Sequence, residues 1–344
     1  MDIIYTEQHR LRNSKTELFG GELVPPFESP QRVETIRQQC LARKIGEIRP
    51  PNTYSPELPH HVHSAPYVQF IADCWRDWQA GGNAGEAIAT CWPSRALPRQ
   101  IVPKEIDGRI GYYAMAGETS ISAGTYEAAL AAAATAATAA DLLHSGQHSA
   151  FALCRPPGHH AATDMFGGYC FFNNVAIAAQ QLLNHGAARV AILDTDFHHG
   201  NGTQEIFYQR DDVLFISLHG DPIYAFPYFL GFADEHGTGA GEGYNINYPL
   251  APETNFAAWN HALQESLTHI NNYAPDYLLV SLGVDTYCKD PISFFKLDSD
   301  DFYTYGKSIA GLGLPTAFVM EGGYAVEEIG INAANVLEGF SAGQ

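Results

Sequence analysis

The chain has 344 residues, of which 46% are hydrophobic and 17% charged, and its formal net charge is −19. This length and composition indicate a globular protein with a large buried core, and they disfavour nucleic acid as a partner because phosphate binding needs clustered Lys and Arg. The negative net charge favours a cationic small molecule as ligand. An acidic composition that serves only solubility explains the charge at least equally well.

Secondary-structure patterns alternate between strands and helices along the chain, which is typical of an α/β fold. Apolar runs predict strands at residues 3–5, 151–154, 189–193, 213–218, 277–280 and 316–320. Helices are predicted from Ser29-Pro30 to near Gly46 and over residues 126–143, 174–183 and 256–273, the last of them begun by Thr254.

Two segments between these elements lack periodicity. Residues 80–111 accumulate Gly, Pro and Ser over a length far above the usual connection of ~4–6 residues, so we expect a functional or interface loop. The glycine-rich run 237–243 has no preceding strand and no following Lys-Ser or Lys-Thr, and we interpret it as a plain flexible loop rather than a phosphate loop.

The cellular compartment is indicated by three features of the sequence. The six cysteines form no Cys-x-x-Cys pair, the first residues show no basic or apolar leader pattern, and no stretch approaches ~18 uninterrupted apolar residues. We therefore expect a cytoplasmic protein with reduced cysteines that does not span a membrane.

The run from Asp194 to Gly202 places two carboxylates and two imidazoles directly after the buried strand predicted at 189–193. Alternation along the strand sends Asp194, Asp196 and His198 to one side. Oxygen and nitrogen donors in this pattern suit a metal ion, although a single Asp or His at a strand end more often caps a helix.

Two further strand ends carry the same kinds of side chain. His159-His160 follows the strand at 151–154, and Asp285 follows the strand at 277–280. Because open α/β sheets build their sites at the carboxyl ends of strands, we expect these groups to meet. Adjacent histidines cannot both face inward from an ideal strand, so a turn at residues 156–158 must direct them.

The tandem histidines, the run 194–202, Gly283-Val284-Asp285 and Glu321-Gly322-Gly323-Tyr324 together resemble the histone deacetylase superfamily along essentially the whole chain. Residues 10–13, 15–18 and 290–297 resemble its bacterial acetylpolyamine amidohydrolases in particular. The resemblance implies the arginase–deacetylase fold, an α/β architecture with a central, mostly parallel sheet flanked by helices on both faces. It also implies a single deacetylase domain over residues 1–344.

The resemblance implies one catalytic Zn²⁺ per subunit, held by Asp196, His198 and Asp285. Three protein ligands leave an open position, as expected of a catalytic rather than a structural zinc. The residues alone do not distinguish zinc from Fe(II), Mn(II) or Co(II), so zinc rests on the resemblance.

The same resemblance assigns catalytic roles. His160 would be the general base that later protonates the leaving amine, and His159, oriented by Asp194, would act electrostatically. Tyr324 would donate a hydrogen bond to the developing oxyanion. Asn201 stands where class I histone deacetylases carry Asp, and a neutral partner should raise the basicity of His160 less than a carboxylate would.

Substrate contacts are implied in the same way. The Gly168 carbonyl would accept the substrate amide N–H, and Tyr169 and Phe226 would form facing walls of an acyl-chain tunnel. The implied substrate-binding set is Phe19, Asp107, Glu118, Gly168, Tyr169, Phe226 and Ile292.

A loop insertion at about residues 80–120 would close the tunnel across a homodimer, with Asp107 and Glu118 recognising a distal ammonium. Asp107 corresponds to Glu in one member of the family, and the shorter Asp side chain reaches less far towards the distal ammonium. The family also binds K⁺ or Na⁺ through backbone carbonyls. Two sites are implied, one using Asp194, Asp196, His198, Ser217 and Leu218 and a second using Phe207, Arg210, Val213 and Tyr244.

The sequence thus predicts zinc-dependent hydrolysis of N-acetylated polyamines or diamines such as acetylputrescine, acetylcadaverine or acetylspermidine, releasing acetate and free amine. A protein acetyl-lysine deacetylase is the nearest alternative. An arginase-type di-manganese ureohydrolase is disfavoured by Asn201, and a non-catalytic acyl-amine-binding protein is disfavoured by retention of the ligands, the histidines and Tyr324.

Overall fold

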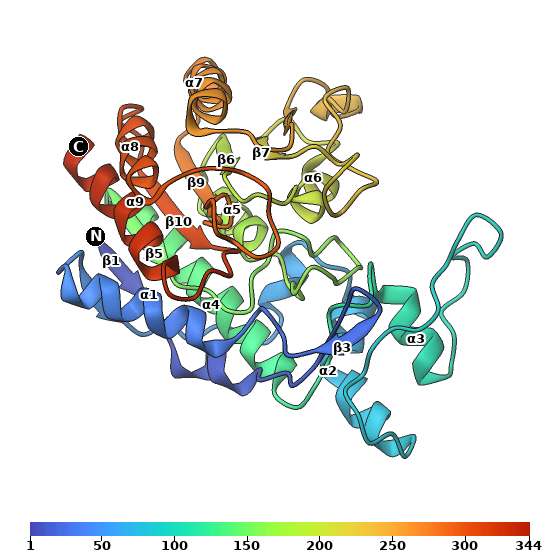
Figure 1. The fold of residues 1–344 in the computed structure, drawn as a ribbon. Coiled ribbons are helices and arrows are strands. Elements are labelled where there is room, and N and C mark those ends of the chain that lie inside the picture. Colours follow the sequence, from blue (N-terminus) through green and yellow to red (C-terminus); the bar gives the residue numbers. More distant parts are fainter.

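The computed structural model describes residues 1–344 and is built around one eight-stranded sheet of order β4-β1-β5-β10-β9-β6-β7-β8 (Figure 1). Every neighbouring pair in this sheet is parallel, so the predicted sheet is confirmed. The strands are β1 (Asp2–Ile4), β4 (Glu47–Arg49), β5 (Ser149–Ala152), β6 (Val190–Asp194), β7 (Val213–Gly220), β8 (Asn245–Leu250), β9 (Tyr277–Leu282) and β10 (Thr316–Met320). A separate antiparallel hairpin joins β2 (Glu17–Phe19) and β3 (Glu22–Val24).

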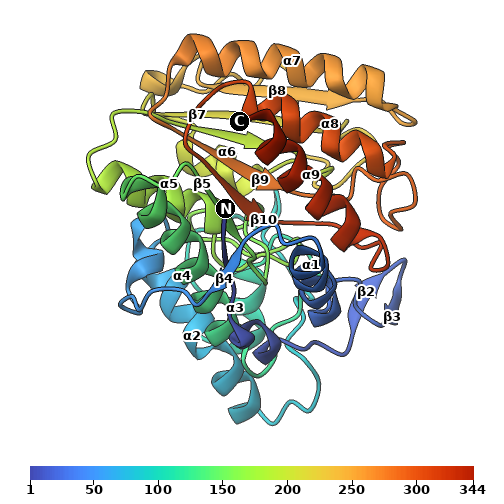
Figure 2. The same cartoon turned by 90° about the vertical axis from the view of Figure 1, so that its left-hand side faces the viewer.

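Helices cover both faces of the sheet, as expected (Figure 2). One face packs against α4 (Thr125–His144) and α5 (Asn174–Asn184), and the other against α1 (Pro30–Ala42), α7 (Phe256–Tyr273), α8 (Ser299–Ala310) and α9 (Ile329–Gly343). Alternation in β6 shows why, since Val190 and Ile192 join the α4–α5 core whereas Ala191 and Leu193 join the opposite core. Strands buried on both faces must be apolar throughout, which is the pattern of the sequence.

A third apolar core lies beside the sheet and contains two helices that the patterns missed, α2 (Ala65–Ala80) and α3 (Ile106–Tyr113). The prediction that residues 80–111 form only a loop is therefore wrong for residues 106–111, which belong to α3. Gly108 and Gly111 weaken the helical signal of α3, but a side chain at Gly111 would meet the Cys91 carbonyl carbon at 2.9 Å, so close packing explains the glycine. Residues 81–105 remain largely irregular and extend away from the main body (Figure 1).

Three predicted boundaries move. The helix α1 ends at Ala42 and not near Gly46, because Lys44 adopts a positive φ of 56°. The strand β5 is shifted to Ser149–Ala152 from the predicted 151–154. The cap of α7 is Asn255 and not Thr254, since Asn255 accepts the Ala258 N–H at 3.2 Å whereas the Thr254 hydroxyl donates to the Ala251 carbonyl.

The parallel arrangement brings the carboxyl ends of β5, β6, β7, β9 and β10 to one edge of the sheet, and the segments that follow them carry the candidate site. The glycine-rich run forms a short 3-10 turn, η3 (Gly239–Gly241). No helix is long and apolar enough to cross a membrane.

Candidate metal centre and active site

The three predicted metal ligands meet in the folded chain. Their donor atoms lie within 4.8 Å of one another, and all three residues are buried. His198 Nδ1 lies 3.3 Å from Asp196 Oδ1 and 3.0 Å from Asp285 Oδ2. Ligand atoms about 2.0–2.2 Å from a tetrahedral ion are separated by roughly 3.3 Å, so the three donors fit a zinc-sized ion.

The charges in this cluster also call for a cation. Burial, followed by repulsion from the nearby Asp196 carboxylate, raises the pKa of Asp285 to about 7. A bound divalent cation would relieve both effects and keep the carboxylates ionised. The remaining carboxylate oxygens hold the backbone, because Asp285 Oδ1 accepts the Phe197 N–H at 2.8 Å and Asp196 Oδ2 accepts the Gly322 N–H at 2.8 Å.

His159 and His160 both point into the site from the irregular segment after β5, with ring centroids 4.1 Å apart. His159 Nδ1 lies 2.9 Å from Asp194 Oδ2. Although burial favours a neutral imidazole, the carboxylates of Asp194 and Asp196 raise the pKa of His159 to about 10. The contact with Asp194 therefore favours the charged form of His159.

His160 has the opposite environment. Burial and the neighbouring imidazoles of His159 and His198 lower its pKa well below the usual range. Its Nδ1 lies 2.7 Å from Asn201 Oδ1, while the Asn201 amide nitrogen faces two acceptors, Met115 Sδ and the His160 carbonyl. The amide oxygen must then accept a hydrogen bond from the Nδ1–H of His160, which leaves the lone pair of the neutral ring on Nε2.

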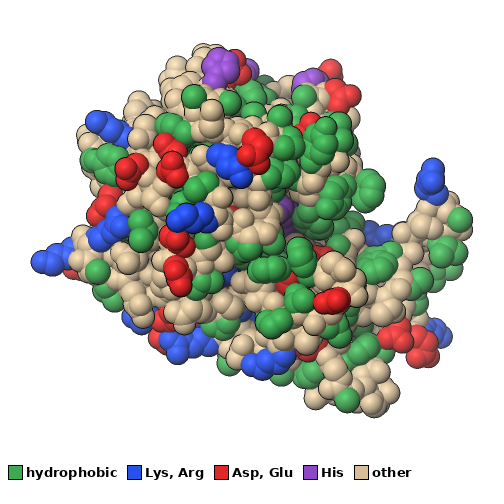
Figure 3. Space-filling model, viewed as in Figure 1, with side chains coloured by type: hydrophobic (Ala, Val, Ile, Leu, Met, Phe, Trp, Pro, Cys, Tyr) green, Lys and Arg blue, Asp and Glu red, His purple; other side chains and the backbone are tan.

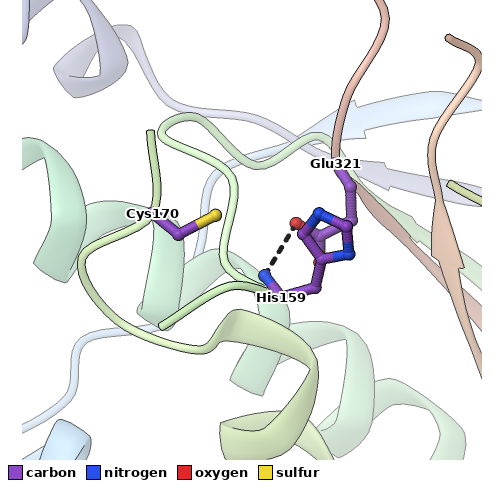
Figure 4. A group of neighbouring side chains, drawn as sticks. All are labelled: His159, Cys170 and Glu321. Carbon is purple, nitrogen blue, oxygen red and sulfur yellow. Dashed lines mark hydrogen bonds between the residues drawn. The ribbon is translucent and has the colours of Figure 1, made fainter. Parts of the chain in front are cut away.

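A second group of potential ligands consists of His159, Cys170 and Glu321, which lie close together (Figure 4). Glu321 Oε2 accepts the backbone N–H groups of Gly158 at 2.6 Å and His159 at 3.1 Å. Burial raises the pKa of the Cys170 thiol well above its ordinary value, so the thiolate that a metal requires is disfavoured. We interpret this group as the support of the turn that directs the histidines.

Tyr324 reaches the site from the loop after β10. Two glycines precede it, and Gly323 has a φ of 124° that side chains rarely adopt. Arg32 of α1 holds this loop, because its guanidinium donates to the carbonyls of Glu321 and Gly323 and lies 4.8 Å from the Tyr324 ring centroid. The phenol thus has a defined position beside the metal ligands.

A cavity of about 310 Å³ opens above these groups. Its walls include eight residues predicted for catalysis or substrate contact, together with the predicted metal ligand His198. The eight are Phe19, Glu118, His160, Gly168, Tyr169, Phe226, Ile292 and Tyr324. Figure 3 shows hydrophobic side chains gathered around a hollow on this face. An apolar wall with few polar groups at its base suits a slender, mostly aliphatic ligand.

The two predicted ammonium-binding acids behave differently. Glu118 lines the cavity, and its Oε1 also accepts the backbone N–H of Gly168 at 2.7 Å. Asp107 lies in the first turn of α3 and is not among the residues that line the cavity. The predicted role of Asp107 therefore stays a prediction.

The candidate monovalent-cation residues are distributed over two places. Asp194, Asp196, Ser217 and Leu218 are buried near the metal ligands, and the Ser217 hydroxyl lies 2.8 Å from His219 Nδ1. The second set lies around the α6 (Asn201–Phe207) to β7 turn, where the Tyr244 carbonyl already accepts the Phe215 N–H. Both sites stay predictions.

The sequence patterns missed several cavity residues and supports. Tyr224 and Tyr228 line the cavity beside Phe226, and the aromatic density of residues 224–229 was an available signal. Glu17 accepts the Tyr169 hydroxyl at 3.2 Å and the Phe27 N–H at 3.0 Å, a pairing for which the sequence offered no signal. Tyr169 itself has a φ of 65°, and such strain is typical of functional sites.

Comparison with known proteins gives a consistent result. Residues 26–340 match the histone deacetylase domain. The chain is 55% identical to an acetylpolyamine amidohydrolase of Mycoplana ramosa over 98% of this chain and 99% of that protein, and 54% identical to acetylpolyamine amidohydrolase 2 of Pseudomonas aeruginosa over 98% of each. A crystal structure of acetylpolyamine aminohydrolase from Burkholderia pseudomallei superposes with a TM-score of 0.95 at 36% identity, covering 100% of this chain and 99% of that one.

Proposed function

The chain belongs to the histone deacetylase family, and on that premise we propose that it hydrolyses the acetyl amide of N-acetylated polyamines and diamines, releasing acetate and the free amine. The single observation that carries this proposal is the mostly apolar cavity that is lined by His160, His198 and Tyr324, with His198 grouped with the other two candidate metal ligands. An acyl chain fits the walls, and its amide would reach the polar base.

We propose Zn²⁺ as the resident metal, with Asp196, His198 and Asp285 as its ligands. Zinc bound there would supply Lewis-acid polarisation of a carbonyl and would lower the pKa of a bound water. The protein groups do the rest. His160 Nε2, free because Nδ1 is bonded to Asn201, accepts the proton of the attacking water and later returns it to the leaving nitrogen.

Two further groups stabilise the negative charge that develops on the carbonyl oxygen. The Tyr324 hydroxyl donates to the oxygen on which negative charge develops. His159, charged through its contact with Asp194, adds positive potential near the same atoms. The Gly168 carbonyl, already approached by the Cys170 thiol at 3.2 Å, would accept the substrate N–H, and its peptide is held by the Tyr169 N–H, which donates to Thr119 Oγ1 at 2.8 Å.

We propose that Glu118 selects cationic substrates. One of its oxygens holds the Gly168 N–H and the Thr119 hydroxyl, and the side chain also faces the cavity, where its charge would attract a distal ammonium. Glu118→Gln removes the charge but keeps an oxygen for Gly168. It should weaken kcat/KM for acetylputrescine and spare an uncharged N-alkyl acetamide of similar length.

Glu127→Gln, an exposed residue of α4, is the matched control for loss of one negative charge. If Glu118→Gln lowers kcat/KM equally for both substrates, or for neither, then Glu118 does not select cationic substrates. The function itself is tested with a panel of acetylated diamines, acetylated polyamines and acetyl-lysine peptides, using zinc-loaded protein. Preference for the peptides would favour a protein deacetylase.

We propose a homodimer formed through the segment 81–105. Its apolar side chains Leu97 and Ile101 are 58% and 83% exposed, which is unusual for a segment that contacts only water. Packing on a second subunit would bury them and bring Asp107 of one subunit towards the cavity of the other. Sedimentation of Ile101→Asp should show a monomer, and an unchanged mass would contradict the proposal.

Two further assignments belong to the same proposal. The carbonyls near Ser217 and Tyr244 would hold K⁺ or Na⁺, which dependence of thermal stability on these ions over Li⁺ would test. The protein would act in the cytoplasm, where its six free cysteines stay reduced, and cell fractionation would test this.

A further inference from the structure

Asp290 is a buried carboxylate that the reaction does not use directly. It lies in the loop between β9 and α8, five residues after the metal ligand Asp285, and is 7% exposed. Its side chain forms no ion pair in the chain. A buried carboxylate without a cationic partner is costly unless hydrogen bonds satisfy it.

Three backbone N–H groups provide those hydrogen bonds. Asp290 Oδ2 accepts from Tyr324 at 2.7 Å and from Ala325 at 3.3 Å, and Oδ1 accepts from Ile292 at 3.1 Å. The Asp290 carboxylate therefore links the loop that carries Tyr324 to the loop that carries Ile292, which lines the cavity. These are charge-assisted hydrogen bonds, which are stronger than those to neutral acceptors.

The position of Tyr324 needs such a contact. Gly322 and Gly323 precede it and give its backbone unusual freedom. Upstream, the Gly322 N–H donates to Asp196, and Arg32 donates to the Gly323 carbonyl of the peptide that precedes Tyr324. At Tyr324 itself, the amide is held by Asp290.

We propose that Asp290 is a positioning residue for the hydrolysis: it fixes the backbone of Tyr324 so that the phenol meets the reacting carbonyl, and it holds Ile292 in register with that phenol. The inference rests on the proposed function for the identity of the reaction. A misplacement of about 1 Å at a catalytic group can cost on the order of 10² in rate, so the clamp has a measurable consequence.

A double-mutant cycle with Tyr324→Phe tests this role on acetylputrescine. Asp290→Ala should lower kcat by about 10- to 100-fold with KM changed less than about threefold, and bound zinc should be unchanged. In the Tyr324→Phe background the same substitution should lower kcat by no more than about twofold, because the phenol that it positions is already absent.

Asp290→Asn keeps one oxygen for the Tyr324 N–H and should restore part of the lost kcat, and it replaces Asp290→Ala in the cycle if that variant does not fold. Asp276→Ala is the control, since Asp276 Oδ2 also accepts two backbone N–H groups, of Ala188 and Arg189, at the opposite end of β9. It should lower stability without changing kcat.

Equal fold-losses in the two backgrounds would overturn the inference, as would loss of zinc from Asp290→Ala, which would place its effect on Asp285 instead. These outcomes leave the proposed function intact, because wild-type turnover of acetylputrescine is measured independently. If wild-type enzyme does not hydrolyse acetylputrescine but hydrolyses acetyl-lysine peptides, the proposed substrate is rejected. The role of Asp290 is then tested by the same double-mutant cycle with the peptide as substrate.

Discussion

Gly168 offers the sharpest test of how the backbone arranges this site. Its φ is 54°, in the left-handed region, and a Cβ added there would overlap Cδ2 of the His160 ring and lie only 2.9 Å from its Nε2. Contacts this short do not persist, so Gly168→Ala must displace the imidazole or the loop. His160 cannot rotate freely, because its Nδ1 is bonded to Asn201 and its ring lies 5.1 Å from that of Phe226.

The expected magnitude follows from that geometry. An ordinary contact begins near 3.4 Å, so the ring must move by roughly 1 Å or more, and a displacement of this size costs about 10² in rate. The positive φ adds about 1–2 kcal/mol of backbone strain in the folded state. We therefore expect Gly168→Ala to lower kcat/KM by about 100-fold or more and to lower the melting temperature by a few degrees.

The matched control is Gly313→Ala, in the turn before β10. Gly313 has a similar φ of 65°, but an added Cβ would meet no atom within 4 Å, so this substitution carries the strain without the clash. Steady-state hydrolysis of acetylputrescine, thermal unfolding and bound zinc are measured for both variants. If Gly168→Ala is as active as Gly313→Ala, His160 is not held where the structure places it.

Three other expectations concern the metal, the oxyanion and folding. Asp285→Ala should abolish bound zinc and activity, measured by elemental analysis and turnover, while circular dichroism shows the fold retained, because a catalytic metal does not hold a core of this size together. Tyr324→Phe should keep zinc and lose about 10²–10³ in kcat, the scale of one oxyanion donor, and a variant as fast as wild type would show that another group polarises the carbonyl. Burial opposes ionisation of Glu34, but hydrogen bonds from Arg10 and Tyr5 prevail and lower its pKa to about 2. This stabilisation is complete above the ordinary value of 4.5 and is lost as pH falls towards 2, so the melting-temperature deficit of Glu34→Gln should be largest near pH 7 and should shrink in acid; a deficit independent of pH would contradict the assignment.

Much of the architecture was predictable because its signals are local. The apolar runs that became β6, β7 and β10 are buried on both faces, so their composition alone identifies them. The strand β6 ends in Asp194, and β10 ends shortly before Tyr324. Because parallel strands place their carboxyl ends at one edge of the sheet, these residues are brought to the same edge. The candidate metal ligands and the tandem histidines could therefore be assigned to one edge of the sheet from the sequence.

The helix α3 could not be predicted in this way. Gly108 and Gly111 interrupt its pattern, and only contact with residues around Cys91 and the side core makes the helix favourable. The cap of α7 likewise depended on the folded structure, because Thr254 and Asn255 are both good cap residues. The Thr254 hydroxyl donates to the Ala251 carbonyl, and Asn255 caps the helix by accepting the Ala258 N–H.

The supports of the site were decided only by the fold. Glu118 meets Gly168 across 50 residues, Glu17 meets Tyr169 across 152, and Glu321 meets Gly158 across 163. In each pair a carboxylate satisfies a donor that is far away in sequence, and nothing local specifies which donor it will be. The sequence by itself determined which side chains could perform the chemistry, because strand ends collect them. Tertiary structure determined their orientation, because a buried carboxylate must find its hydrogen-bond donors wherever packing brings them.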